Sequence, residues 1–372
     1  MAGLYIHIPF CKKACNYCDF HFSTQLKNKA AMIDAICKEI KIKKNYAQAQ
    51  NLSSIYLGGG TPSLLSEKEL EKIIDCANKY FLLEDKIEVT LEANPDDINA
   101  ASLKFLKKLG VNRLSIGLQS FNNEELKWMN RAHTAEESSV CVKMAQDNGF
   151  ENISIDLIYG SKFQTVETWQ NTLKKAIDLD VKHISSYNLT IEHKTALGLK
   201  HHKGLEPAIN DELSSSQFLL LVETLNNANF IHYEISNFGR ENYFAVHNSN
   251  YWLGQHYIGV GPSAHSFNGD SRQWNIKNNQ QYIDKINSNE SFFEIENLTI
   301  QNKYNEYILT RLRTIWGCDI NEMKLIFGKE ITDHFENEIN NKTMFVEEKN
   351  GIYTLNNKGK LLADGIAADL FL

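Results

Sequence analysis

Residues 11–18 read CKKACNYC, and they follow directly on the apolar, strand-like run LYIHIPF at residues 4–10. Three of the chain's seven cysteines, Cys11, Cys15 and Cys18, fall within this short stretch. The C-x3-C-x2-C spacing allows three thiolates to bind three irons of a 4Fe-4S cluster, whereas electron-carrier clusters are held by four cysteines. One iron would then remain open to a small chelating ligand.

The same three cysteines have two structural alternatives, a zinc knot and a disulfide. Neither has an obvious fourth ligand or partner at short range. Lys12 and Lys13 lie beside the thiols, and positive charge there would help to hold them as thiolates. The spacing therefore favours an iron–sulfur cluster.

The composition excludes several functional classes. A chain of 372 residues with 42% hydrophobic content can build one large core and a smaller second one. A net charge of -7 without a run of Lys or Arg gives no footprint for nucleic acid or an anionic membrane. We see neither an export signal nor an apolar run long enough to span a membrane. The cysteines are odd in number and mostly isolated, which suits a reducing compartment better than a disulfide framework. We therefore expect a cytoplasmic protein with no nucleic-acid partner and no transmembrane segment.

Strand-like and helix-like segments alternate through the first half of the chain. The candidate strands are residues 5–8, 54–57, 87–91, 113–117, 153–158 and 183–188, and each precedes a stretch with helical periodicity. Successive β-α units predict a parallel sheet with right-handed crossovers. The fold class is therefore α/β, a partial (β/α)6 barrel, with ligands expected at the carboxyl ends of the strands.

Local signals support the helices. Ser66 with Glu69, and Thr134 with Glu137, have the spacing of capping boxes. The isolated cysteines Cys37, Cys76 and Cys141 fall on or beside apolar helix faces, so we interpret them as buried small side chains rather than ligands.

The sequence pattern divides the chain into residues 1–228, the partial barrel, 229–299, an aromatic and histidine-rich connecting region, and 300–372, a C-terminal domain. The connecting region has little helical period, and we expect it to be something other than scaffold. The sequence pattern of residues 300–372 predicts helices around a hairpin with an Asn350-Gly351 turn, which is typical of a winged-helix-like domain. Its slight acidic excess favours packing or protein contact over DNA binding.

Polar residues recur where the predicted strands end. The run Gly58-Gly59-Gly60-Thr61-Pro62 either lets backbone amides approach a ligand or forms a plain tight turn. Glu92, Gln119 and Asp156 end or interrupt apolar strands, where polar groups need partners. Arg131 could bind a ligand carboxylate in a bidentate manner or form an internal salt bridge.

Several ordered motifs carry a resemblance to a known family. They are HIPFC at residues 7–11 with the cysteine spacing, GGGTP at 58–62, LEANP at 91–95, NRLSIGLQSF at 112–121 and DLIYG at 156–160. Together they resemble the radical S-adenosylmethionine (SAM) proteins related to oxygen-independent coproporphyrinogen III dehydrogenase, over essentially the whole chain. Within that group the chain resembles the HemW-type haem chaperones.

The resemblance implies a 4Fe-4S cluster on Cys11, Cys15 and Cys18, with SAM on the open iron and an external electron donor if SAM is cleaved. By matching motif positions, the residues implied to contact SAM are Tyr5, Tyr17, Gly59, Gly60, Thr61, Glu92, Gln119, Arg131 and Asp156. No catalytic residue is assigned.

Two features separate the branches of this group. The dehydrogenases carry another cysteine two residues past the third, where this chain has Phe20, and they have a longer arm before the cluster loop. The segment HNSNYW at residues 247–252 matches the HNxxYW motif of the haem-chaperone branch, which implies haem bound by His247 beside Tyr251. A hydrogen-bonded aromatic core is the alternative for these residues. The chain departs from the family's sequence at Ser161-Lys162-Phe163 and at residues 240–246. We therefore expect the loop after Gly160 and the rim of the haem pocket to differ in shape from those of the family.

We therefore expect a haem chaperone that binds haem, a 4Fe-4S cluster and SAM, and transfers haem to acceptor apoproteins. The alternative is oxygen-independent coproporphyrinogen III dehydrogenase activity.

Overall fold

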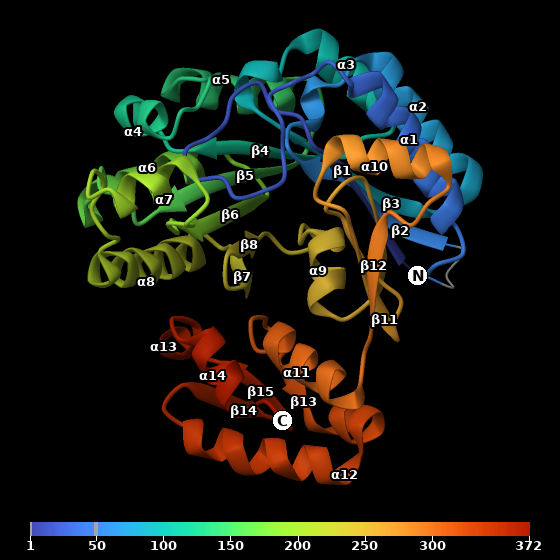
Figure 1. Cartoon of the computed structure of the whole chain (residues 1–372). Helices are drawn as coiled ribbons and strands as arrows, with labels where there is room; N and C mark the ends of the chain where they lie inside the picture. Colours follow the sequence, from blue (N-terminus) through green and yellow to red (C-terminus); the bar gives the residue numbers. More distant parts are fainter. Residues whose placement is uncertain (1, 48–50) are drawn as a thin grey trace.

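Residues 2–47 and 51–372 are described by a computed structural model, in which a 12-stranded sheet is the main feature (Figure 1). Six adjacent parallel strands form its centre in chain order: β1 (Ala2–Ile8), β2 (Asn51–Gly59), β3 (Leu82–Ala93), β4 (Arg113–Gln119), β5 (Asn152–Tyr159) and β6 (His183–Asn188). These are the six predicted strands. The sheet does not close on itself, as expected of a partial barrel.

Helices cover the outer face of the central strands (Figure 1). They are α1 (Lys29–Lys43), α2 (Glu67–Tyr80), α3 (Ala100–Lys108), α4 (Asn123–Trp128), α5 (Ala135–Asp147), α6 (Val166–Asp178), α7 (Ala196–His202) and α8 (Asp211–Asn227), with short 3-10 turns at Pro62–Leu64 and Pro95–Asp97. Both capping boxes are confirmed, at Ser66 of α2 and Thr134 of α5. Cys141 lies in the core, and Cys37 and Cys76 pack against it, as predicted.

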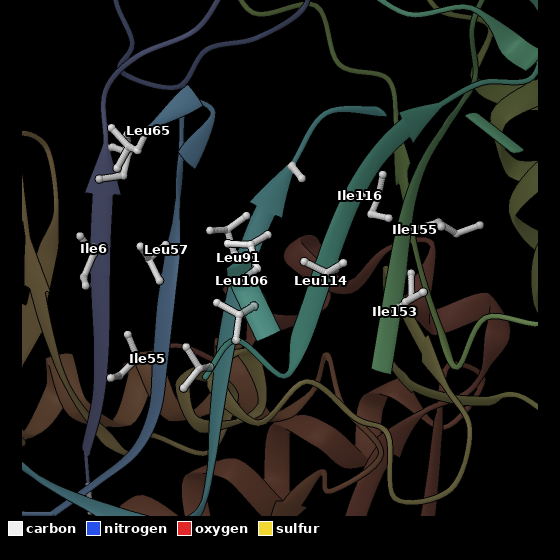
Figure 2. Close-up of a cluster of buried hydrophobic side chains, with 14 of the residues drawn as sticks. Ile6, Ile55, Leu57, Leu65, Leu91, Leu106, Leu114, Ile116, Ile153 and Ile155 are labelled. Atoms are coloured by element: carbon white, nitrogen blue, oxygen red, sulfur yellow. The ribbon is translucent and has the colours of Figure 1, made fainter. Parts of the chain in front are cut away.

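A continuous apolar row holds the sheet to these helices. Ile6, Leu57, Leu91, Leu114 and Ile153 are register partners across five adjacent strands, and all are fully or almost fully buried (Figure 2). Burying each such side chain contributes about 1.5–3 kcal/mol. Because side chains alternate along a strand, the neighbours of this row point to the inside of the barrel. The functional site is built from those neighbours.

Residues 229–299 differ from the expectation, because much of this segment extends the sheet at both edges. β7 (Ile231–Glu234) and β8 (Asn237–Gly239) continue it beyond β6, and β9 (His256–Val260), β10 (His265–Phe267), β11 (Ser271–Asn275) and β12 (Phe293–Asn297) continue it beyond β1. Between these groups runs α9 (Val246–Trp252), and α10 (Asn279–Ser288) packs on α1. Strands of three to five residues are too short to show a clear period in sequence.

The C-terminal segment has a hydrophobic core of its own, built around Tyr304 and Phe335. It comprises α11 (Ile300–Arg311), β13 (Cys318–Asp319), α12 (Ile320–Ile339, interrupted at Gly328), a 3-10 turn at Asn340–Lys342, β14 (Val346–Lys349), β15 (Ile352–Leu355), α13 (Asn357–Lys360) and α14 (Ala363–Asp369). Asn350 and Gly351 have φ of 56° and 79°, as the predicted type I′ turn requires. Backbone hydrogen bonds from Ile235 to Arg313 and from Ile315 to Tyr233 join this segment to the sheet.

Within the described residues, every helix is too short or too polar to cross a lipid bilayer.

Candidate functional site

A cavity of about 510 Å³ lies at the carboxyl ends of the central strands. The three clustered cysteines line it, together with most of the residues implied to contact SAM: Tyr17, Gly59, Gly60, Thr61, Glu92, Gln119, Arg131 and Asp156. These side chains come from loops and strand ends spread over the first half of the chain. The structure therefore brings them together as the motif order predicts.

The loop that carries the cysteines is held at several points. The amide of Cys11 donates to the carbonyl of Ser23, and the amide of Cys18 donates to the carbonyl of Cys15. Asn16 bonds through its amide to Met129, after α4, and accepts at its carbonyl from Leu197 of α7. These contacts fix the loop over the mouth of the barrel.

The thiols themselves are part-buried, and burial raises the pKa of both Cys11 and Cys18 to about 11. Lys12 does not offset this effect as expected, because its ammonium pairs with Asp96 and Asp97. The cation that contacts a thiol is Arg131, whose Nη1 lies 3.5 Å from Cys15 Sγ. Bound iron, rather than a neighbouring lysine, would have to keep these thiols deprotonated.

The arrangement of the thiols fits a 4Fe-4S cluster better than the structural alternatives. All seven cysteines are free, and in the described part of the chain no three His, Cys, Asp or Glu side chains converge on one metal position. A zinc knot needs such convergence. A cluster binds each thiolate on a different iron, so three thiols that line one cavity suit it.

The glycine run packs closely against the segment before the cysteines and also lines the first cavity. A Cβ on Gly59, whose φ is +101°, would lie 2.4 Å from the His7 ring, and one on Gly60 would lie 2.6 Å from the carbonyl oxygens of Ile8 and Phe10. The amides are also used within the protein, since Gly59 donates to Glu92 at 3.0 Å and Gly60 to Ile8 at 2.8 Å. The glycines thus let β2 approach the cluster loop.

Two carboxylates face the cavity from β3 and β5, the strands on either side of β4. Glu92 accepts from Tyr56 Oη at 2.8 Å and from Gly59, and burial raises the pKa of Glu92 to about 7. Burial also raises the pKa of Asp156 to about 6, although the charge of Arg113 opposes this. Hydrogen bonds from Ser115 to Asp156 are long, at 3.4 Å. Both carboxylates retain lone pairs that could accept from hydroxyl or ammonium groups of a ligand.

Arg131 and Gln119 are held differently. Nη2 of Arg131 donates to Asn94 and to the carbonyl of Gly117, each at 2.7 Å, while its Nε is buried without a partner in the described residues. Within the described residues, Arg131 forms no salt bridge with a carboxylate, so the internal salt bridge considered for it is not formed there. Gln119 has a φ of 66° at an irregularity between β4 and β5, a conformation that is uncommon for non-glycine residues and turns its side chain to the cavity.

His247 lies at the start of α9 and is only 2% exposed. Its Nδ1 hydrogen-bonds Ser54 Oγ at 2.8 Å and its Nε2 hydrogen-bonds Tyr251 Oη at 3.0 Å. Burial lowers the pKa of His247 to about 3, so the ring is neutral. Iron ligation by His247 stays a prediction, and it requires the Tyr251 hydroxyl to leave Nε2.

A second cavity, of about 350 Å³, adjoins the first and shares Asp19 and Phe20 with it. Tyr5 and Tyr251 line this second cavity. Tyr5 lines this cavity rather than the first, with its ring centroid 6.1 Å from that of Tyr56, which lines the first, and its hydroxyl bonds His7 Nδ1 at 3.0 Å. Phe20 is 72% exposed at the boundary of the two cavities.

Some lining residues were not singled out from sequence. Arg113 is 1% exposed and lies 3.9 Å from Glu88, and Asn248 of α9 reaches the first cavity while its neighbour His247 does not. A signal for Arg113 and Ser115 was available, because polar residues alternate with Leu114 and Ile116 along β4. Such alternation in a strand buried on both faces indicates a polar interior.

Comparisons with known proteins agree with this geometry. The model of the Radical SAM superfamily matches residues 5–176. The heme chaperone HemW of Bacillus subtilis is 31% identical, with 98% of each chain covered, and the heme chaperone HemW of Escherichia coli is 36% identical, with 71% of this chain and 69% of that protein covered.

A solved structure shares the fold over the full length. It is described as "Coproporphyrinogen III oxidase (HemN) from Escherichia coli is a Radical SAM enzyme", and it covers 100% of this chain and 90% of that one with a TM-score of 0.85. At 23% identity this likeness shows the fold alone. The relatives matched over most of their length carry the assignment: the chain belongs to the radical SAM superfamily and, within it, to the HemW family of haem chaperones.

Proposed function

We propose that this protein is a haem carrier that holds a 4Fe-4S cluster and SAM in its first cavity and passes haem to acceptor apoproteins. The observation that carries the proposal is the full-length likeness to a protein named as a heme chaperone. The two adjoining cavities support it, because they offer one space for a cofactor and another for a cargo. The free cysteines fit the predicted cytoplasmic location, which forms part of the proposal.

The residues of the first cavity suit the cluster and SAM. Cys11, Cys15 and Cys18 would bind three irons, and SAM would chelate the fourth. When bound, the pair would supply reductive radical chemistry. Glu92 and Asp156 would accept hydrogen bonds from ammonium or hydroxyl groups, and the buried, unpartnered Nε of Arg131 offers a donor.

Phe20 argues against dehydrogenase activity, as it does in sequence. It occupies the position where the resembling dehydrogenases have a further cysteine, and it projects from the rim between the cavities. A phenyl ring at this position can make apolar contacts, but unlike a cysteine thiol it cannot donate a hydrogen atom or an electron. The same position suits contact with the face of a macrocycle.

The direct test offers two compounds in parallel to the anaerobic, cluster-reconstituted protein. With haemin we expect a Soret band that stays with the protein through gel filtration. With coproporphyrinogen III, SAM and a reductant we expect no protoporphyrinogen. Turnover of coproporphyrinogen, or the absence of bound haem, would overturn the proposal.

A further inference from the structure

The second cavity has the composition of a haem site, and the HNxxYW motif contributes Tyr251 to its lining. Its lining is His7, His21, His265, Tyr5, Tyr251, Tyr257, Asp19, Phe20, Ser263, Ala264 and Lys277. Three imidazoles, several aromatic rings and one lysine around about 350 Å³ combine an iron ligand, stacking surfaces and a cation.

The three histidines differ in the nitrogens they leave available. His7 has both ring nitrogens engaged, by Tyr5 Oη and by the carbonyl of His21. His21 uses Nε2 in a 2.7 Å bond to Asn279. For His265 no hydrogen bond to either ring nitrogen is present within residues 2–47 and 51–372, and the side chain is exposed. His265 is therefore the histidine of this lining with both ring nitrogens available to iron, whereas His21 has Nδ1 alone.

The backbone of His265 is firmly positioned. It faces Gly259 so closely that a Cβ there would lie 1.9 Å from the His265 carbonyl oxygen. The next residue, Ser266, accepts from the Gly259 amide at 3.0 Å and from Lys43 at 3.1 Å. Gly259 is the register partner of Tyr5 on β1, which places His265 beside the aromatic wall of the cavity. Such a fixed position is what a ligand residue needs.

The aromatic side chains and the lysine of the second cavity also suit a haem. Tyr251 and Tyr257 pack edge to face with ring centroids 4.4 Å apart, and Tyr251 is held by its bond to His247. The ammonium of Lys277 has no carboxylate partner in the described part of the chain, and it lies at the cavity where a haem propionate could pair with it.

We propose that haem docks in this second cavity, with its iron bound by His265 and a propionate paired with Lys277, while His247 positions Tyr251 and does not touch iron. The inference rests on the proposed haem-carrier function and names its cargo site. Each ring nitrogen of His247 already has a partner, so this assignment leaves its hydrogen bonds intact.

The test titrates full-length, cluster-reconstituted protein with ferric haem and records the Soret band as a difference spectrum against the haem-free sample. We expect His265→Ala to weaken binding by at least about 10-fold, the lower end of the loss that even an outer-shell change causes at a metal site. Millimolar imidazole should restore the spectrum of His265→Ala. His202→Ala, an exposed histidine on α7, is the matched control and should bind as the wild type does.

A second ligand tests the propionate contact. Lys277→Ala should weaken the binding of haem but leave that of haem dimethyl ester unchanged, because the ester has no carboxylates. Wild-type binding by His265→Ala, or a loss in His265→Ala that imidazole does not rescue, would overturn the inference. So would a loss in His247→Ala or His21→Ala that imidazole does rescue. Absence of haem from the wild type would instead overturn the proposed function itself.

Discussion

Glu88 of β3 is predicted to anchor the helix that carries His247. Its Oε1 and Oε2 accept from the amides of His247 and Val246, each at 3.0 Å, and α9 has no side-chain cap of its own because its N-cap residue is Ala245. Glu88 is only 6% exposed, and Arg113 lies 3.9 Å from it. Replacing Glu88 therefore leaves two amides without their acceptor and removes the carboxylate that pairs with the Arg113 guanidinium.

The magnitude follows from those bonds. A hydrogen bond to a charged group contributes about 1.5–3 kcal/mol, so Glu88→Ala should destabilise α9 by roughly 3–6 kcal/mol. Glu88→Gln keeps one acceptor oxygen and should cost about half as much. Because each 1.4 kcal/mol is a factor of ten, the alanine variant should exchange the first amides of α9 at least about 100-fold faster.

Hydrogen exchange read by mass spectrometry on peptides spanning residues 244–254 measures this locally. Asp85→Ala, an exposed carboxylate on the same strand, is the control and should leave exchange unchanged. Protection of these peptides as strong in Glu88→Ala as in the wild type would refute the reasoning that a tertiary carboxylate caps α9.

Three further predictions concern the first cavity. Cys11→Ser should lose most bound iron after reconstitution, whereas Cys37→Ser, on α1, should keep it; equal iron contents would contradict the cluster assignment. Glu92 and Asp156 have raised pKa values of about 7 and about 6, so they are largely protonated below pH 6. Affinity for cationic SAM, measured by calorimetric titration, should therefore increase as pH rises from 6 to 7. The free energy of unfolding of the ligand-free protein should fall as pH rises towards 7, because a raised pKa in the native state means that the native state is stabilised by protonation. Gly60→Ala places a Cβ 2.6 Å from two carbonyl oxygens of the strand and loop before the cysteines, and it should cost about 1–3 kcal/mol in chemical denaturation and lower the iron content.

The scaffold of the barrel was predictable because its signals are local. Apolar strands followed by amphipathic helices, and the capping boxes at Ser66 and Thr134, indicate the β-α order directly. The turn at Asn350-Gly351 is similarly local, since two successive positive φ angles favour those residue types.

The edges of the sheet were not predictable in the same way. β8 and β10 have only three residues each, and both edges join the central sheet through distant pairings, β8 with β6 and β9 with β1. These two pairings join residues separated by about 50 or more positions in the chain, which periodicity does not report.

The candidate site shows the same division. Motifs located the three cysteines and most of the cavity lining, but they could not show that the Lys12 ammonium is taken by acidic residues or that His247 has both ring nitrogens engaged. Both facts depend on the partners that folding brings together. The availability of His265 is a fact of the same kind.

The transfer of haem is the central claim, and delivery to an apoprotein tests it most directly. The haem-loaded protein is mixed anaerobically with excess apomyoglobin, and the absorbance of holomyoglobin is followed over time, with myoglobin and the carrier then separated by size. The account predicts that haem leaves the carrier for apomyoglobin and that the carrier is recovered haem-free with its iron–sulfur cluster intact. Haem that stays on the protein throughout, or a protein that never holds haem, would contradict it.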